Sequence, residues 1–407
     1  MKVTTKQTLS RLVKTSIAAA LFLSPASAFY EIGVGHVSAA SAVHHTAINL
    51  KPFWTKTVGN PNKINTRATL LKNDLYYTVG NTYIAFDALA GRTRWTFQAS
   101  AVSQTVTDGQ SVWFTDAKGQ LLKLNAKSGK LQWKVQTQVS PKKGERYSNF
   151  SLHLADGVIY VGDEYGLTAY YASNGKVKWK TKSNNHGFNL LQTGDMLVVS
   201  TTISGALTTS GLQGIEAKSG KVKWTLTDGD HQDILFSDGQ TLYSRDESSG
   251  IDAGYAANID EIRLSNGTIK ATRSYIPVDF VEMQSASDVV SDGDYFYVIG
   301  KYDDEQTQAV ISRFPVDGPL GDEPDQTYTF DAPVVDWSFA NRDGVAYVSL
   351  NNGKQIALDT NSGKTLTSVH YKGNPNPLST IVGQDVILVQ HGANFSGVKV
   401  TSSANRQ

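Results

Sequence analysis

A column of small polar residues recurs along the chain and could form a site for a polar ligand. Each member lies five residues before a short turn marker such as Asp108-Gly109, and the members are Ser103, Ser151, Asn189, Asp233, Ser287, Ser338 and Ser379. Hydroxyl, amide and carboxylate groups that repeat at one level of a fold can hydrogen-bond to a polar ligand. The alternative interpretation is that these positions are solvated and simply tolerate small polar side chains.

Two histidines could add acid–base or metal chemistry to this column. His186 and His231 each follow a tryptophan, Trp179 or Trp224, by seven residues, so we expect them on the same face of adjacent repeats. Imidazole groups placed in this way could bind a metal or exchange protons near neutral pH. No third ligand stands in register with them, so ordinary surface histidines are the favoured interpretation.

The strands that must position these residues are indicated by a sequence phrase that recurs along the chain. Its clearest copy is Leu124–Trp133, and further copies are 86–95, 170–179, 215–224 and the weaker 358–367. Each copy reads as an apolar run, a Gly-Lys or Gly-Arg turn and an alternating segment that ends on a large aromatic residue. This pattern is typical of a strand, a tight turn and a second strand.

The spacing of the turn glycines predicts the architecture. They are Gly91, Gly129, Gly175, Gly220, Gly267, Gly318 and Gly363, separated by 38, 46, 45, 47, 51 and 45 residues. A second marker, usually Asp-Gly, falls out of phase with them, which indicates four short strands per repeat. In the first repeat we expect strands at 68–72, 75–79, 83–87 and 94–98. A period near 45 residues with four strands is typical of a blade of a β-propeller.

We therefore predict an all-β propeller of four-stranded antiparallel blades, with eight blades and seven as the alternative. The segment 48–58 resembles a lone outermost strand, and 378–400 supplies three strands that lack a fourth. Joined, they would complete the last blade and close the ring without a free sheet edge. Trp95, Trp133, Trp179 and Trp224 should pack toward neighbouring blades. Ala271 and Thr367 replace them later, so we expect less regular packing in the second half.

The phrase Ala-x-x-x-Gly-Lys-x-x-Trp resembles the pyrroloquinoline-quinone-type propeller repeat over about 49–402. Proteins with this repeat include quinoprotein alcohol dehydrogenases and the scaffold type of outer-membrane assembly factor B. The resemblance implies a propeller, but enzymes and scaffolds share it. The dehydrogenases carry a vicinal cysteine pair, long insertions and calcium ligands, and this chain has no cysteine. The resemblance thus favours the non-catalytic branch, without the quinone.

The N-terminus and the charge balance indicate the compartment and exclude some partners. Residues 1–28 read as a secretory signal, with cleavage after Ala28 or as late as 42, and 29–47 read as a polar linker before a single propeller domain, 48–407. Without residues 1–28 the chain holds 34 basic against 37 acidic residues. This near-neutral balance argues against nucleic acid and an anionic membrane. We expect a monomer without a membrane span that is secreted or envelope-associated, and periplasmic if the host has an outer membrane.

The sequence favours binding over catalysis. In a propeller the longer connections gather on one face, and one of them carries Lys142 and Arg146. We expect a non-enzymatic protein that binds a protein, a peptide or an envelope polysaccharide through this face and the funnel. The alternative is a carbohydrate-active or quinoprotein-type enzyme with its site in the central funnel. Acid clusters such as 303–305 do not match a calcium loop, so no cofactor is expected, with weak calcium binding left open.

Overall fold

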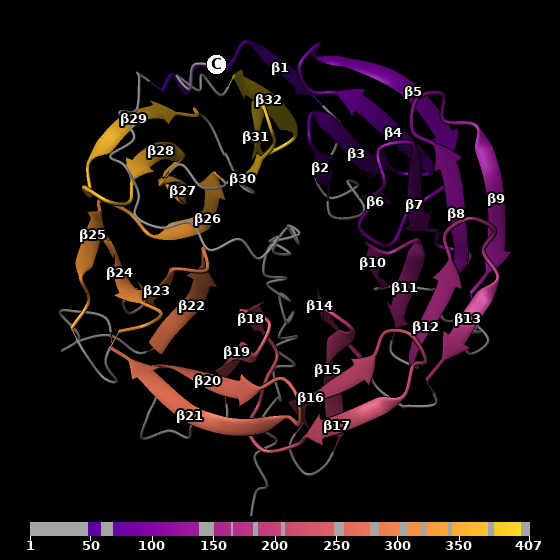
Figure 1. Ribbon diagram of the computed structural model, residues 1–407. Helices are drawn as coiled ribbons and strands as arrows, with labels where there is room; N and C mark the ends of the chain where they lie inside the picture. Colours follow the sequence, from indigo (N-terminus) through magenta and orange to yellow (C-terminus); the bar gives the residue numbers. More distant parts are fainter. Residues whose placement is uncertain are drawn as a thin grey trace, which may run out of the picture.

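Eight four-stranded antiparallel sheets form a closed ring in the computed structural model, which confirms the predicted eight-bladed propeller (Figure 1). The structure describes residues 48–57, 68–137, 150–163, 166–181, 186–204, 208–247, 256–276, 285–301, 308–318, 323–340, 344–372 and 378–399. The predicted signal and linker segments lie outside these ranges. No helix long and apolar enough to cross a membrane occurs within the described ranges.

Each blade is a simple meander whose strands run in sequence from the centre of the ring to its rim. Blades 1 and 2 contain β2 (Thr69–Leu71), β3 (Asp74–Val79), β4 (Thr82–Asp87), β5 (Arg92–Gln98), and β6 (Val106–Thr107), β7 (Ser111–Thr115), β8 (Gln120–Asn125), β9 (Leu131–Gln136). Blades 3 and 4 contain β10 (Ser151–Ala155), β11 (Val158–Asp163), β12 (Gly166–Tyr171), β13 (Val177–Lys180), and β14 (His186–Thr193), β15 (Met196–Ser204), β16 (Thr208–Glu216), β17 (Val222–Leu226). Blades 5 and 6 contain β18 (Ile234–Ser237), β19 (Thr241–Asp246), β20 (Ala257–Arg263), β21 (Thr268–Tyr275), and β22 (Ser285–Ser291), β23 (Tyr295–Lys301), β24 (Ala309–Pro315), β25 (Gln326–Phe330). Blade 7 contains β26 (Val334–Ala340), β27 (Val345–Leu350), β28 (Lys354–Asp359) and β29 (Thr365–His370).

Blade 8 closes the ring with strands from both ends of the described chain. It combines β30 (Leu378–Val382), β31 (Val386–His391) and β32 (Asn394–Lys399) with β1 (Trp54–Thr57). In the β1–β32 pair, Trp54 lies opposite Gly397, and Thr57 Oγ1 donates a hydrogen bond to Asn394 Oδ1 at 2.7 Å. The predicted closure by an N-terminal strand is therefore confirmed.

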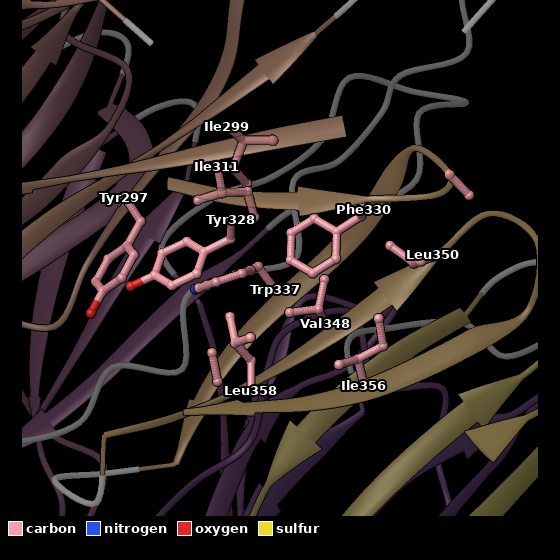
Figure 2. Close-up of a cluster of buried hydrophobic side chains, with 12 residues drawn as sticks. Tyr297, Ile299, Ile311, Tyr328, Phe330, Trp337, Val348, Leu350, Ile356 and Leu358 are labelled. Atoms are coloured by element: carbon pink, nitrogen blue, oxygen red, sulfur yellow. The ribbon is translucent and has the colours of Figure 1, made fainter. Parts of the chain in front are cut away.

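The apolar cores lie between blades rather than within them. Each junction of the ring has its own cluster of buried side chains. Figure 2 shows the one between blades 6 and 7, where Trp337 lies among Tyr297, Tyr328 and Phe330, with ring centroids 5.6, 6.1 and 6.5 Å away. Because every sheet buries both faces against its neighbours, the ring is held by packing and needs no covalent link.

The tryptophans of the repeated phrase lock one blade onto the next, as the sequence predicts. Trp95 Nε1 in blade 1 donates a hydrogen bond to Ala126 O of blade 2 at 2.8 Å, and its ring lies on Gly129. Gly129 has φ +68°, and a Cβ there would meet Trp95 Cδ2 at 2.6 Å. Only glycine satisfies both the backbone conformation and the close approach of the indole. The same bond recurs from Trp179 to Ala217 O at 2.9 Å.

Other donors take over where the tryptophan is missing. In blade 6, Tyr328 Oη donates to Thr360 O of blade 7 at 2.6 Å, at the carbonyl equivalent to Ala126 O. In blade 5, Arg273 donates to Gly318 O of blade 6 while its Nε binds Glu261. The second half is therefore less regular in residue type, yet its blade junctions are still bridged by hydrogen bonds.

Candidate functional site

Polar side chains on the innermost strands connect successive blades around the centre of the ring. Gln104 Nε2 donates to Leu152 O at 2.8 Å, and Asn189 Nδ2 donates to Gln232 O at 2.5 Å. Ser338 Oγ donates to Thr380 O at 2.8 Å. Each bond joins a side chain of one blade to the backbone of the next. Asn189 and Ser338, two members of the predicted column, thus contribute to ring closure.

Three carboxylates on neighbouring inner strands form what we call the acidic arc: Asp233, Asp288 and Asp336. Asp233 directly precedes β18, Asp288 lies opposite Ile299 in blade 6, and Asp336 lies opposite Ser349 in blade 7. Burial, together with the like charge of Asp233, raises the pKa of Asp288 to about 6. Burial likewise raises the pKa of Asp336 to about 7, with a smaller contribution from Asp288. Like charges on neighbouring blades therefore raise the pKa values of Asp288 and Asp336, and a cation beside these carboxylates would be stabilised.

Arg245 partly offsets this negative charge. Its side chain lies 3.3 Å from Glu247 Oε1, and its positive charge lowers the pKa of both Asp233 and Asp288 against the effect of burial. Within the described residues no group of three or more acidic or histidine side chains is arranged to hold a metal ion. Asp336 is buried and its Oδ2 accepts a hydrogen bond from Thr380 N at 2.7 Å, whereas Asp233 and Asp288 are half-buried and are the more accessible carboxylates of the arc.

The remaining column residues lie in different surroundings. Ser103 Oγ accepts a hydrogen bond from Thr115 N at 2.9 Å and donates to Gln104 O at 2.9 Å. Ser151 begins β10 and is buried, and among the described residues its Oγ has no hydrogen-bond partner. Ser379 lies in β30 opposite Gln390. Ser287 lies at a β-bulge of β22, and Lys142 and Arg146 lie outside the described residues.

His231 is completely buried, which corrects the interpretation of it as a surface histidine. Its exposed fraction is 0%. Its backbone N donates to Ser210 O of blade 4 at 2.6 Å, and its Nε2 lies 3.1 Å from Asp228 O and 3.5 Å from Asp260 Oδ2. The loop that carries it folds back against blade 4, which the seven-residue spacing could not reveal. His186 is the first residue of β14, so the two histidines are not shown to share a site.

Sequence reasoning missed Asp288 and Asp336 because it counted a fixed five residues back from the turn, which selected Ser287 and Ser338. Ser287 is the extra residue of a β-bulge, since the pairing shifts by one residue between Ala286 and Asp288, and the neighbouring Asp288 is the residue that pairs regularly. Asp336 precedes Ser338 by two residues with regular pairing between them, so both lie on the same face of β26, and a carboxylate at this spacing was the available signal.

The fold and the repeated docking of an aromatic residue on a turn glycine define an eight-bladed propeller of the quinone-type repeat. A family model described as outer membrane protein assembly factor BamB matches residues 47–164 and 143–314. The chain belongs to this family. No match was found among curated proteins.

Three solved structures share the fold. BamB from Moraxella catarrhalis has a TM-score of 0.58 at 12% identity, with 86% of this chain and 100% of that chain covered. The quinohemoprotein alcohol dehydrogenase from Comamonas testosteroni has a TM-score of 0.57 at 12% identity, with 88% of this chain and 77% of that chain covered. The computationally designed protein Ika8 has a TM-score of 0.56 at 12% identity, with 84% of this chain and 98% of that chain covered. At this identity the likeness describes the fold alone.

Proposed function

We propose that this chain is a non-catalytic binding propeller that holds a protein or peptide partner through a basic segment at the acidic arc. The single observation that carries the proposal is the placement of Asp233, Asp288 and Asp336 on the inner edges of three successive blades, where the charge of Asp233 raises the pKa of Asp288 and that of Asp288 raises the pKa of Asp336. Membership of a family described by an outer-membrane assembly factor supports a scaffold rather than an enzyme.

The charge of the site favours a cationic partner over the quinone of the related dehydrogenases. Pyrroloquinoline quinone carries three carboxylates, and the acidic arc would repel them. The chain also has no cysteine for a vicinal pair. The residues present therefore do not fit this cofactor, and no step through it is derived.

A basic side chain would gain most at Asp288. The Asp288 carboxyl is largely withdrawn from water, so an ammonium or guanidinium group beside it replaces lost hydration and lowers its pKa again. Ionisation of Asp288 above about pH 6 should strengthen binding, because only the charged form attracts the cation.

The test uses a fluorescent peptide rich in lysine and arginine, with an acidic peptide of equal length as the reference. The double variant Asp233→Asn/Asp288→Asn should bind the basic peptide at least about tenfold more weakly, equivalent to about 1.4 kcal/mol. The control Asp195→Asn/Asp294→Asn removes the same charge from two exposed turns and should leave affinity unchanged.

Equal affinity of wild type and the Asp233/Asp288 variant for the basic peptide would refute the proposal. Retention of a neutral envelope glycan in place of the peptide would refute it in favour of glycan binding. A visible chromophore after incubation with the quinone and calcium would refute it in favour of an oxidoreductase.

A further inference from the structure

The small net charge of the chain conceals two halves of opposite sign. Residues 48–227, which form β1 and blades 1 to 4, hold 22 Lys and Arg against 10 Asp and Glu, a net charge of +12. Residues 228–399, which form the rest of the ring, hold 11 Lys and Arg against 26 Asp and Glu, a net charge of −15. Such a separation creates fields that the total of +1 does not reveal.

The positive charge is concentrated on the outer edge of the ring. The outermost strands β1, β5, β9, β13, β17, β21, β25 and β29 contain no Asp or Glu within their bounds. On blades 2 to 4 the outermost strands and the residue after each turn glycine carry what we call the lysine rim: Lys130, Lys134, Lys176, Lys178, Lys180, Lys221 and Lys223. Figure 1 shows β9, β13 and β17 following one another along the outside of the ring.

The rim lysines are available to an external anion. All are exposed except Lys178, which is half-buried. Lys223 forms an ion pair with Glu216 at 3.0 Å, and in the described part of the chain the other rim lysines form none. Because exposed ammonium groups on flexible stems can adapt to successive anionic groups, the rim suits a ligand with repeated charges.

Protection of open sheet edges does not account for the rim. Lysines on edge strands oppose edge-to-edge pairing, and charges of either sign serve that purpose. However, β25 and β29 are equally outermost strands and contain no Lys or Arg, and at the rim positions blade 7 has only Lys364, after its turn glycine, where each rim blade has two or three lysines. The lysines therefore follow one arc of the ring rather than every exposed edge.

The shape of the rim distinguishes between polyanions. It curves outward over three blades, so a flat membrane or a stiff duplex could meet only part of it at a time. Single-stranded nucleic acids bind by stacking their bases on exposed aromatic rings. On the rim strands, Trp179 and Trp224 are only 9% and 6% exposed and Trp133 is half-buried, because they pack between blades. Tyr171 of blade 3 is 43% exposed, and one exposed ring does not provide a stacking surface for successive bases. A flexible chain of phosphodiester groups without bases fits the rim best.

We propose that the lysine rim of blades 2 to 4 binds a flexible phosphodiester-linked polyanion of the cell envelope, of the poly(glycerol phosphate) type. This surface is separate from the acidic arc, so either proposal can fail without the other. The field of the opposite half would orient the ring so that blades 2 to 4 face the polymer.

The experiment measures binding of the full ring to poly(glycerol phosphate) at several salt concentrations. The variant Lys134→Gln/Lys180→Gln/Lys221→Gln removes one exposed charge from each rim blade. Each lost phosphate contact should reduce the slope of log K against log salt by about 0.7, or about 2 for the three. The control Lys364→Gln/Lys372→Gln/Lys399→Gln removes three exposed lysines from blades 7 and 8 and should leave the slope unchanged.

An unchanged slope in the rim variant would overturn the proposal, as would an equal loss in the control. Tighter binding of anionic phospholipid vesicles or duplex DNA than of the polymer, per charge and at equal salt, would assign the rim to that partner instead. Sedimentation of wild type without polymer tests a second copy as the occupant. If wild type self-associates in a salt-sensitive way and the rim variant does not, the rim binds the acidic half of a second molecule and not the polymer.

Discussion

The contact between Trp95 and the turn glycine of the next blade makes a sharp quantitative prediction. In Gly129→Ala, the new Cβ would lie 2.6, 2.7 and 2.9 Å from three atoms of the Trp95 ring. The indole must move, and its hydrogen bond to Ala126 O at 2.8 Å is lost or weakened. We expect a large loss of stability from a single methyl group.

The magnitude is the sum of separate effects. A non-glycine residue in the left-handed region costs about 1–2 kcal/mol. Overpacking adds about 1–3 kcal/mol, and the weakened hydrogen bond about 1 kcal/mol. Gly109→Ala is the matched control, because Gly109 has φ +85° and a Cβ there would meet nothing within 4 Å. It should show the backbone cost alone, so the two variants should differ by about 2–4 kcal/mol.

The assay is urea unfolding followed by circular dichroism, with Trp95→Ala as a second background. If the contact with the indole causes the extra loss of stability, Gly129→Ala should lower the free energy of unfolding no more than Gly109→Ala does in the Trp95→Ala background. Equal losses for Gly129→Ala and Gly109→Ala in the wild-type background would refute the reasoning. An undiminished loss for Gly129→Ala in the Trp95→Ala background would refute it as well.

Two further predictions concern pH and ring closure. Because burial raises the pKa of Asp336 to about 7, its proton stabilises the fold at low pH. This contribution is lost as pH rises from about 4 to about 7, by roughly 1.4 kcal/mol per unit. Unfolding free energies of wild type and Asp336→Asn should diverge over this range, and parallel pH profiles would contradict the prediction. Trp54→Ala should cost about 3 kcal/mol, because the ring lies on Gly91 and its Nε1 donates to Ala88 O at 2.7 Å. Phe53→Ala, at an exposed neighbour, is its control in the same urea assay, and a comparable loss there would show that closure does not depend on the indole.

The blade count and ring closure could be predicted because each depends on local sequence. A tight turn with a left-handed residue needs glycine, and every turn glycine from Gly91 to Gly363 except Gly318 has a positive φ, so their spacing reports the repeat directly. The lone strand near Trp54 indicated the closure, since an unpaired outer strand at one end must complete an unfinished blade at the other.

The site was only partly predictable because register within a strand depends on tertiary packing. The bulge at Ser287 shifts the pairing of β22, and the sequence around it carries no local marker of the bulge. The burial of Asp336 depends on the neighbouring blade, where Thr380 N donates a hydrogen bond to its Oδ2 at 2.7 Å. The burial of His231 depends likewise on a loop that folds against blade 4.

The sequence by itself determined the repeat, the order of the strands and the tryptophans that dock blade to blade, because these are encoded by short-range turn and pairing preferences. Only the tertiary structure decided which polar groups meet. It placed carboxylates of three blades along one inner arc and lysines of three other blades along one outer rim. The physical reason is that charge acts through distance in space, and a ring brings together residues that the chain separates.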